Sequence, residues 1–367
     1  MRSSSRLEVP ITEEHTYKVI IGRNVFKEVE SALPENVKPC LAVVGEGVAK
    51  GARWVLKEAS AVFPHWEILK DGEAAKDLSV ALNIIRKLWE LKADRWCALG
   101  VIAGGSLGDT ASFAASVYMR GIPLIQFPTT LLAMIDSSLG GKTAVNFEGF
   151  KNVLGSFYHP WLVVDDLRFL DTLPDRVFKS SMAEAIKYGI TLNPEFLKYL
   201  KDNSSKILAR DDEYVSKVIA ESVKTKLEVV RKDPRERKGV REVLNFGHTV
   251  GHALESASKF ELLHGEAVAL GMVVETLYAE RVGACSSCYE ALEGALSAYS
   301  LTQVKAPKMT IEEYKAMILK DKKRVGDRLR LPLLEGVGRW RLELVPLDEF
   351  VETTFKIMEE VFWSEDF

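Results

Sequence analysis

The first half of the chain alternates short apolar runs with longer amphipathic stretches. Two stretches, 78–93 and 109–121, carry apolar residues at the spacing of a helix. The short apolar runs have the length and composition of buried strands, and they span residues 40–48, 96–105, 122–130 and 161–166. Strands that alternate with helices in this way predict βαβ units and a largely parallel sheet.

The second half has an almost wholly helical pattern after the turn-rich segment 171–176. Residues 328–346 predict a β-hairpin, and the remaining stretches predict helices over 178–191, 213–232, 241–257, 265–283 and 347–363. We therefore predict an α/β fold with two domains, a Rossmann-like parallel-sheet domain over 1–175 and a mostly α-helical domain over 176–367. Open parallel sheets bind ligands at the carboxyl ends of their strands, so the active site is expected in the cleft between the domains.

Composition narrows the class of protein. The 367 residues carry a formal net charge of −3, which argues against a nucleic-acid partner or a polybasic membrane contact. No apolar run approaches the roughly 20 residues that span a bilayer. The first residues lack the apolar middle of a signal peptide, so we expect a cytoplasmic protein.

The four cysteines predict no catalytic or metal function. Cys40 and Cys97 stand in apolar strand-like runs and are interpreted as small core residues. Cys285 and Cys288 have the spacing of half a zinc knuckle or a redox pair, but no second CxxC exists and the segment lies between two helical patterns. A structural or incidental role is the favoured interpretation.

The stretch "AGGSLGD" (103–109) lies where a predicted strand meets a helix and allows three interpretations. Its glycines would let the backbone approach a pyrophosphate, although Ala103 takes the first glycine place of GxGxxG. The same letters give a nucleophile elbow centred on Ser106, as in a serine hydrolase. The third interpretation is a tight turn without a ligand.

The stretch "DSSLGGKTAVN" (136–146) is similar to the end of a phosphate-binding P-loop. That interpretation fails because Asp136 stands where the leading glycine is required. A Gly-Gly turn that delivers Asp136 and Lys142 into a cleft remains, with a solvated lysine as the alternative.

Three histidines stand within "LNFGHTVGHALESASKFELLHGEAV" (244–268). His248 and His252 are one helical turn apart and could share a metal, and His264 with a carboxylate from another helix could complete a three-ligand site. Glu184 in "MAEAIKYG" is such a carboxylate. It stands in an apolar stripe, so we expect a cation partner for it. The alternative is three histidines that are structural.

Taken together, the order of these segments resembles the 3-dehydroquinate synthase family over nearly the whole chain. The resemblance rests on the segments "GDTASFAASVYMRGIPLIQFPTTLLAMIDSSLGGKTAVN", "KNVLGSFYHP", "AEAIKYG", "LNFGHTVGHALE" and "LLHGEAVALGM". The resemblance implies an NAD- and zinc-dependent enzyme (cobalt being possible) that acts on a sugar-acid phosphate. The reaction that the resemblance implies has five steps, which are alcohol oxidation, phosphate elimination, ketone reduction, ring opening and aldol closure. The resemblance also argues against the serine-hydrolase interpretation of Ser106.

The resemblance assigns residues to four groups. Metal ligands are Glu184, His248 and His264, while His252 faces the substrate. Catalytic residues are Asp136, Lys142, Lys187, Glu236, Asn245 and His252. Substrate-binding residues are Arg120, Asn152, Lys226, Arg241 and Lys322, the last favoured over Lys323. Across the catalytic and substrate-binding groups, Lys142, Asn152 and His252 would surround the phosphate, and Lys226 and Arg241 would bind the carboxylate. Arg120 would reach a neighbouring subunit's site, which implies a homodimer. NAD-binding residues are Glu73, Lys76, Gly104, Gly105, Asp109, Thr129, Thr130, Asp136, Lys142, Lys151 and Thr172.

This sequence departs from the family pattern at three places. Gly45 stands where the family usually ends a strand with an aspartate that contacts the adenosine ribose, and Glu46 is the nearest replacement. Phe147 and Phe150 lie in a loop that is normally more polar. The segment 233–241 is one residue longer than the pattern, so the assignment of Glu236 depends on where that residue is inserted.

Two other functions stay open beside the synthase. Another sugar phosphate cyclase would use a different sugar phosphate. A related NAD-dependent polyol dehydrogenase would share the architecture but release NADH, and it would not need so many cations for phosphate and carboxylate.

Overall fold

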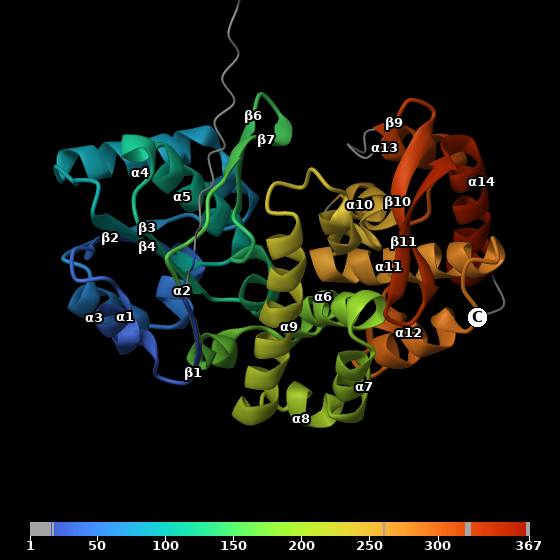
Figure 1. Cartoon of the computed structure of the whole chain (residues 1–367), viewed down its shortest axis with the longest axis horizontal. Helices are drawn as coiled ribbons and strands as arrows, with labels where there is room; N and C mark the ends of the chain where they lie inside the picture. The colour runs from blue at the N-terminus through green and yellow to red at the C-terminus, as the bar shows by residue number, and fades with distance from the viewer. Residues whose placement is uncertain (1–15, 17, 260, 320–323, 365–367) are drawn as a thin grey trace, which may run out of the picture.

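The structure, a computed structural model, describes residues 16, 18–259, 261–319 and 324–364. An α/β part and a helical part lie side by side, with helix α9 (Asp212–Lys232) standing between them (Figure 1). The larger apolar core includes Phe26 and Phe127 of the first part and Phe178 and Met182 of the second. The two parts therefore pack directly against each other.

The α/β part is built on a six-stranded sheet in the order β1-β8-β5-β4-β2-β3, and every pairing in it is parallel. Its strands are β1 (Lys18–Gly22), β2 (Lys38–Gly45), β3 (His65–Leu69), β4 (Cys97–Ala103), β5 (Leu124–Pro128) and β8 (Leu162–Asp166). Strands β4, β5 and β8 are buried along their whole length, which explains their continuous apolar runs. The predicted parallel sheet is confirmed.

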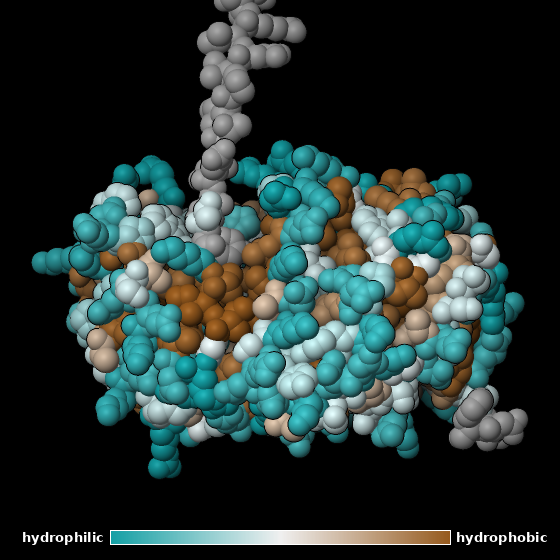
Figure 2. Space-filling view, turned by 60° about the horizontal axis from the view of Figure 1, so that its bottom comes forward, coloured by the Kyte–Doolittle hydropathy of each residue, from teal (hydrophilic) through white to brown (hydrophobic). Residues whose placement is uncertain are grey.

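Helices connect these strands, as a parallel sheet requires. They are α1 (Val29–Ala32), α2 (Glu46–Gly51), α3 (Trp54–Val62), α4 (Leu78–Glu90) and α5 (Gly105–Val117), with short turns η1 (Phe26–Glu28), η2 (Glu73–Lys76), η3 (Tyr118–Arg120), η4 (Ala133–Ser137) and η5 (Leu167–Thr172). The sequence did not predict the antiparallel hairpin of β6 (Lys142–Phe147) and β7 (Phe150–Phe157). Figure 2 shows one face of the molecule, on which apolar surface gathers mainly over the α/β part.

The helical part begins at Asp175, beside the predicted boundary. Its helices are α6 (Asp175–Leu192), α7 (Pro194–Asp202), α8 (Ser204–Leu208), α9, α10 (His248–Ala257), α11 (His264–Arg281), α12 (Cys288–Ser297), α13 (Ile311–Ile318) and α14 (Leu347–Met358), with turns η6 (Val240–Asn245), η7 (Leu301–Gln303) and η8 (Glu359–Trp363). The predicted hairpin is present as β10 (Arg328–Gly336) and β11 (Arg339–Pro346), beside the two-residue β9 (Arg324–Val325). No described helix is long and apolar enough to cross a membrane.

One predicted helix, over 241–257, is wrong in its extent. The chain forms η6, turns at Phe246 and Gly247, and starts α10 at His248. Gly247 has a φ of +78°, a conformation that favours glycine and that a continuous helix does not contain. The break makes His248 the first residue of a helix.

The cysteines are paired in the structure. Cys40 and Cys97 form a disulfide between β2 and β4, with their Cα atoms 5.5 Å apart. The sequence predicted two separate core residues. Cys97 is buried as predicted, but Cys40 is half-buried, and a register shift between Pro39 and Leu41 accompanies the pairing. Cys285 and Cys288 form a second disulfide at the start of α12, whose first residue is Cys288, and the structural role of that pair stays a prediction.

Candidate active site

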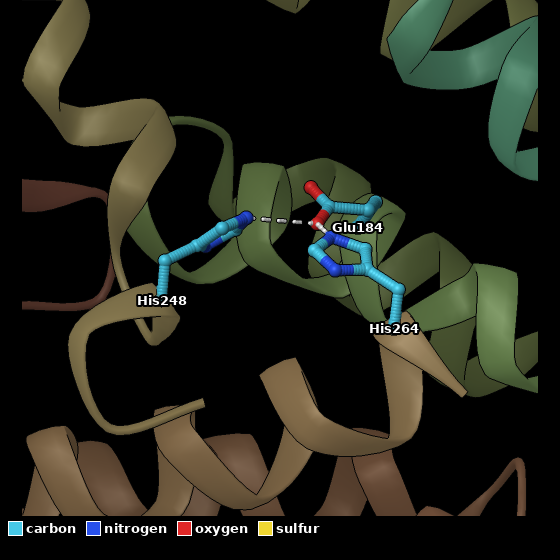
Figure 3. Close-up of side chains that lie close together, drawn as sticks. All are labelled: Glu184, His248 and His264. Carbon is cyan, nitrogen blue, oxygen red and sulfur yellow. Dashed lines mark ion pairs between the residues drawn. The ribbon is translucent and has the colours of Figure 1, made fainter. Parts of the chain in front are cut away.

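Three side chains from three helices converge on one point in the helical part. Glu184 comes from the middle of α6, His248 begins α10 and His264 begins α11. The Nε2 atoms of both histidines lie 3.4 Å from Oε1 of Glu184 (Figure 3). One donor atom from each residue lies within 4.8 Å of the other two. The structure therefore brings together the three predicted metal ligands.

Glu184 is completely buried, and its carboxylate forms an ion pair with Lys187 one turn along α6. The predicted cation partner is confirmed. Burial opposes ionisation, but the charge of Lys187 and then the contact with His264 outweigh it, so the pKa of Glu184 is lowered. The carboxylate is thus held as an anion away from solvent.

The buried imidazole of His248 is held in a fixed orientation. Its Nδ1 lies 3.1 Å from the carbonyl oxygen of Phe246, so Nδ1 carries the proton and Nε2 faces Glu184 with its lone pair. Burial, followed by the charge of Lys187, lowers the pKa of His248 well below its usual value. A neutral imidazole with a fixed tautomer can bind a metal.

These residues fit a divalent metal by chemistry as well as position. A carboxylate and two imidazoles form a common three-ligand set for catalytic zinc, with the fourth position left for water or substrate. Both oxygens of Glu184 are shielded from solvent, so a cation at this point would meet a charge that water does not screen. His252 is exposed, and its ring centre lies 5.3 Å from that of His248. It also belongs to a second possible donor group, with Glu255 and His264, that is more exposed than the first.

A second buried charge cluster lies between η4 and α9. Lys226 donates to Oδ1 of Asp136 at 2.6 Å and to its carbonyl oxygen at 2.7 Å, and the hydroxyl of Tyr188 donates to the same Oδ1 at 2.5 Å. Burial opposes ionisation of Asp136, but Lys226 and then Lys187 lower its pKa far below the usual value. Tyr188 was not singled out from the sequence, although it follows Lys187 directly.

The glycine turn after η4 is fixed by arginine. Arg241 is 2% exposed and donates to the carbonyl oxygens of Gly140 at 2.8 Å and Pro234 at 3.0 Å. Gly140 has a φ of +84°, and a Cβ there would lie 2.7 Å from the guanidinium of Arg241. Arg241 thus joins two loops, and its predicted role as a carboxylate ligand stays a prediction. Lys142, just beyond the turn, pairs with Glu236 at 2.7 Å.

Predicted nucleotide contacts gather at the carboxyl edge of the sheet. Gly104 and Gly105 lie where β4 passes into α5, and Thr129 and Thr130 follow β5. Lys76 is 7% exposed and donates to Asp109 at 2.5 Å and to Asn152 at 2.7 Å, and Lys151 lies 3.6 Å from Glu73. Thr172 ends η5 beside Gly51. A helix amino terminus next to a glycine pair fits a dinucleotide pyrophosphate.

The structure identifies a carboxylate beside Gly45 that the sequence did not suggest. A Cβ on Gly45 would lie 2.2 Å from Oδ1 of Asp71, which follows β3, and the N–H of Gly47 donates to Oδ2 of Asp71 at 2.6 Å. Burial raises the pKa of Asp71, and the Gly47 bond opposes that rise. The predicted replacement, Glu46, instead pairs with Lys50 on the outside of α2. No strand was predicted from the sequence over His65–Leu69, so nothing in that prediction pointed to the β2–β3 pairing that brings Asp71 beside Gly45.

The remaining predicted residues lie apart from these clusters or outside the described chain. Arg120 is exposed at the end of η3, with a φ of +65°. Asn245 ends η6 and is half-buried. Ser106 lies inside the first turn of α5, and Lys322 lies outside the described residues.

Comparison with known proteins first defines a class. A solved 2-deoxy-scyllo-inosose synthase, complexed with carbaglucose-6-phosphate, NAD+ and Co2+, is 28% identical, with a TM-score of 0.84 over 93% of this chain and 96% of that one. A 2-epi-5-epi-valiolone synthase from Streptomyces hygroscopicus, with NAD+ and Zn2+ bound, has the same TM-score at 24% identity, over 96% and 99% of the two chains, which shows the shared fold. The chain thus has the architecture of the sugar phosphate cyclases.

The sequence comparisons identify the family within that class. The model of the 3-dehydroquinate synthase N-terminal domain matches residues 66–180, and the model of the C-terminal domain matches residues 181–324. The 3-dehydroquinate synthase of Sulfurisphaera tokodaii is 45% identical over 282 residues, which is 76% of this chain and 80% of that protein. The chain belongs to the 3-dehydroquinate synthase family.

Proposed function

We propose that this enzyme converts 3-deoxy-D-arabino-heptulosonate 7-phosphate into 3-dehydroquinate and phosphate, with NAD⁺ and one divalent metal bound, zinc being the expected ion. The observation that carries the proposal is the buried convergence of Glu184, His248 and His264, in a chain whose family is known. The charge clusters around Asp136 and Lys76 are proposed to complete the site on the side of the sheet.

We place the metal on Glu184, His248 and His264 rather than on the second donor group. Glu184 is fully buried, whereas His252 is exposed, and an anion shut off from water attracts a cation more strongly than one that water screens. A bound divalent ion would polarise the substrate's hydroxyls and lower their pKa. His252, which is exposed and is not one of the three proposed ligands, is proposed to exchange a proton with the phosphate.

Cations near the proposed metal site match the anionic groups of the substrate. Lys142 follows the glycine turn, Lys226 pairs with Asp136 and Lys187 pairs with Glu184. These cations can attract phosphate and carboxylate, while the two carboxylates keep the site near neutrality. Lys142, Asn152 and His252 are proposed around the phosphate, and Lys226 and Arg241 around the carboxylate. Asn245 and Glu236 are proposed to orient the reacting hydroxyls.

NAD⁺ is proposed to lie along the carboxyl ends of β2, β4 and β5. When bound it would accept and return a hydride, so that no net oxidation occurs. We propose that Asp71 contacts the adenosine ribose, because its carboxylate lies where a side chain at position 45 would be. The pyrophosphate would lie at Gly104 and Gly105, against the amino terminus of α5.

We propose a homodimer in which Arg120 reaches the partner's site. In support of this, Arg120 is exposed, and Val117 and Met119 beside it are 46% and 43% exposed. Exposed apolar side chains next to a cation suit a surface that a second chain covers. A cytoplasmic location stays a prediction of the sequence.

The test is phosphate release from the heptulosonate phosphate with NAD⁺ and Zn²⁺ present. Phosphate should appear over many turnovers, while the concentration of NADH, measured by its absorbance, stays below the concentration of the enzyme. NADH that accumulates in proportion to substrate would instead indicate a polyol dehydrogenase. Turnover of another sugar phosphate, with none of the heptulosonate phosphate, would indicate a different cyclase.

A further inference from the structure

Glu275 is a buried carboxylate on α11 that the proposed chemistry does not use. It is 4% exposed, and its two oxygens accept hydrogen bonds from three backbone N–H groups of a different helix. Oε2 accepts from Gly247 at 2.8 Å, and Oε1 accepts from Thr249 at 3.1 Å and Val250 at 3.2 Å. These groups are at the amino terminus of α10, on either side of His248.

The N–H groups of a first helical turn have no partner within their own helix. A side chain at the N-cap position usually supplies one, but the N-cap of α10 is Gly247, which has no side chain. Glu275 takes over this function from a distance of 28 residues along the chain. The start of α10, and with it the imidazole of His248, is therefore fixed by α11.

Close backbone contact between the two helices makes the arrangement rigid. A Cβ on Gly271 would lie 1.9 Å from the carbonyl oxygen of Gly247 and 2.6 Å from the N–H nitrogen of Gly251. A Cβ on Gly251 would lie 2.9 Å from the carbonyl oxygen of Ala267. Because α11 also begins with His264, one helix positions both histidines of the candidate metal centre.

The charge of Glu275 matters as well as its shape. The amino terminus of a helix carries about half a positive elementary charge, which disfavours a cation beside it. His248 is the first residue of α10, so a metal on its Nε2 would meet this partial charge. A carboxylate bound to the same N–H groups offsets it.

We propose that Glu275 is a positioning residue for the metal centre, which holds His248 in place and neutralises the amino terminus of α10. This inference rests on the proposed function, in which His248 is a metal ligand. It predicts that loss of the carboxylate weakens metal binding while the nucleotide site is unaffected.

The experiment measures the dissociation constant of Co²⁺ and of Zn²⁺ on metal-free protein by competition with a chromogenic chelator, together with the Co²⁺ absorption spectrum. Glu275→Gln keeps the shape, but its amide can accept on one side only. Thr276→Val is the matched control, because Thr276 is equally buried on α11 and its hydroxyl has no hydrogen-bond partner among the described residues. We expect Glu275→Gln to raise the dissociation constant about 10- to 100-fold and to change the spectrum. Thr276→Val should bind like the parent, and NAD⁺ affinity should be the same in all three proteins.

Metal affinity of Glu275→Gln equal to that of Thr276→Val would overturn the inference. Should Glu275→Gln not fold, Glu275→Asp takes its place, since it keeps the charge but withdraws the carboxylate, and parental affinity in that variant would also overturn it. The proposed function fails separately, if the parent binds no metal or if His248→Ala binds it as tightly as the parent.

Discussion

Removing the carboxylate of Asp71 tests the structure at the place where the sequence departs from its family. The variant Asp71→Ala removes a charged acceptor, and hydrogen bonds to charged groups contribute about 1.5–3 kcal/mol each. Since about 1.4 kcal/mol is a factor of ten, the dissociation constant of NAD⁺ should rise about 10- to 150-fold. The lower end is expected, because Asp71 is an exposed residue and water screens its charge.

Changes at Gly45 should act through the same carboxylate. A Cβ at position 45 would lie 2.2 Å from Oδ1 of Asp71, so Gly45→Ala should push the carboxylate aside and weaken NAD⁺ binding. In Gly45→Asp two carboxylates would compete for this space, and their repulsion at about 4 Å costs about 1 kcal/mol in water and about 4 kcal/mol near a protein surface. The double variant Gly45→Asp with Asp71→Ala returns one carboxylate from the strand, and we expect it to recover most of the affinity.

The assay is a fluorescence or calorimetric titration with NAD⁺ at constant ionic strength. Glu46→Gln is the matched control, because Glu46 pairs with Lys50 and should not affect the cofactor. The reasoning is refuted if Asp71→Ala binds NAD⁺ like the parent. It is equally refuted if Glu46→Gln loses as much affinity, since the ribose contact would then lie on α2.

Three further predictions follow from the helical part and the sheet. Alanine at any one of the three proposed metal ligands should abolish metal content, measured by atomic emission, whereas His252→Ala should keep the metal and lose turnover. Metal that is lost in His252→Ala but kept in Glu184→Ala and His248→Ala would instead favour the second donor group. Arg241→Lys keeps the charge, but a lysine cannot hold two carbonyl oxygens in a fork. We therefore expect kcat/KM to fall by a factor that corresponds to a loss of about 1–3 kcal/mol in transition-state stabilisation, and unchanged kinetics would place Arg241 outside the site. Burial raises the pKa of Asp165 well above its usual value, and neither of its oxygens has a hydrogen-bond partner among the described residues. The folded state therefore binds this proton more tightly than the unfolded state, and stability falls as pH rises from the unfolded pKa towards the folded one. Asp165→Asn should remove this loss and raise the free energy of unfolding by about 1–3 kcal/mol at neutral pH but little near pH 4, measured by urea denaturation; an equal effect at both pH values would contradict the assignment.

Local pattern was sufficient for most of the architecture. Continuous apolar runs predicted β4, β5 and β8 because both faces of a parallel sheet are covered, and helical spacing predicted α4, α9 and α11. The hairpin of β6 and β7 was missed because β7 is largely exposed, β6 is only partly buried, and neither strand has a long apolar run. The predicted helix over 241–257 was too long, because the sequence does not show which glycines adopt a positive φ, as Gly247 does, and which stay helical.

The candidate site also has a part that the sequence predicted and a part that only the structure shows. The sequence by itself brought forward the residues that are proposed to carry the chemistry, because Glu184, His248, His264, Lys187 and Asp136 stand in the long motifs that resemble the 3-dehydroquinate synthase family. Only the tertiary structure decided which groups meet across distant segments. Asp71 lies beside Gly45 because β3 pairs with β2, Cys40 joins Cys97 because β2 pairs with β4, and Glu275 caps α10 because glycines let α11 approach it. Such contacts depend on strand order and on the distance between helices, which are set by the packing of the whole core and not by the residues next to each position.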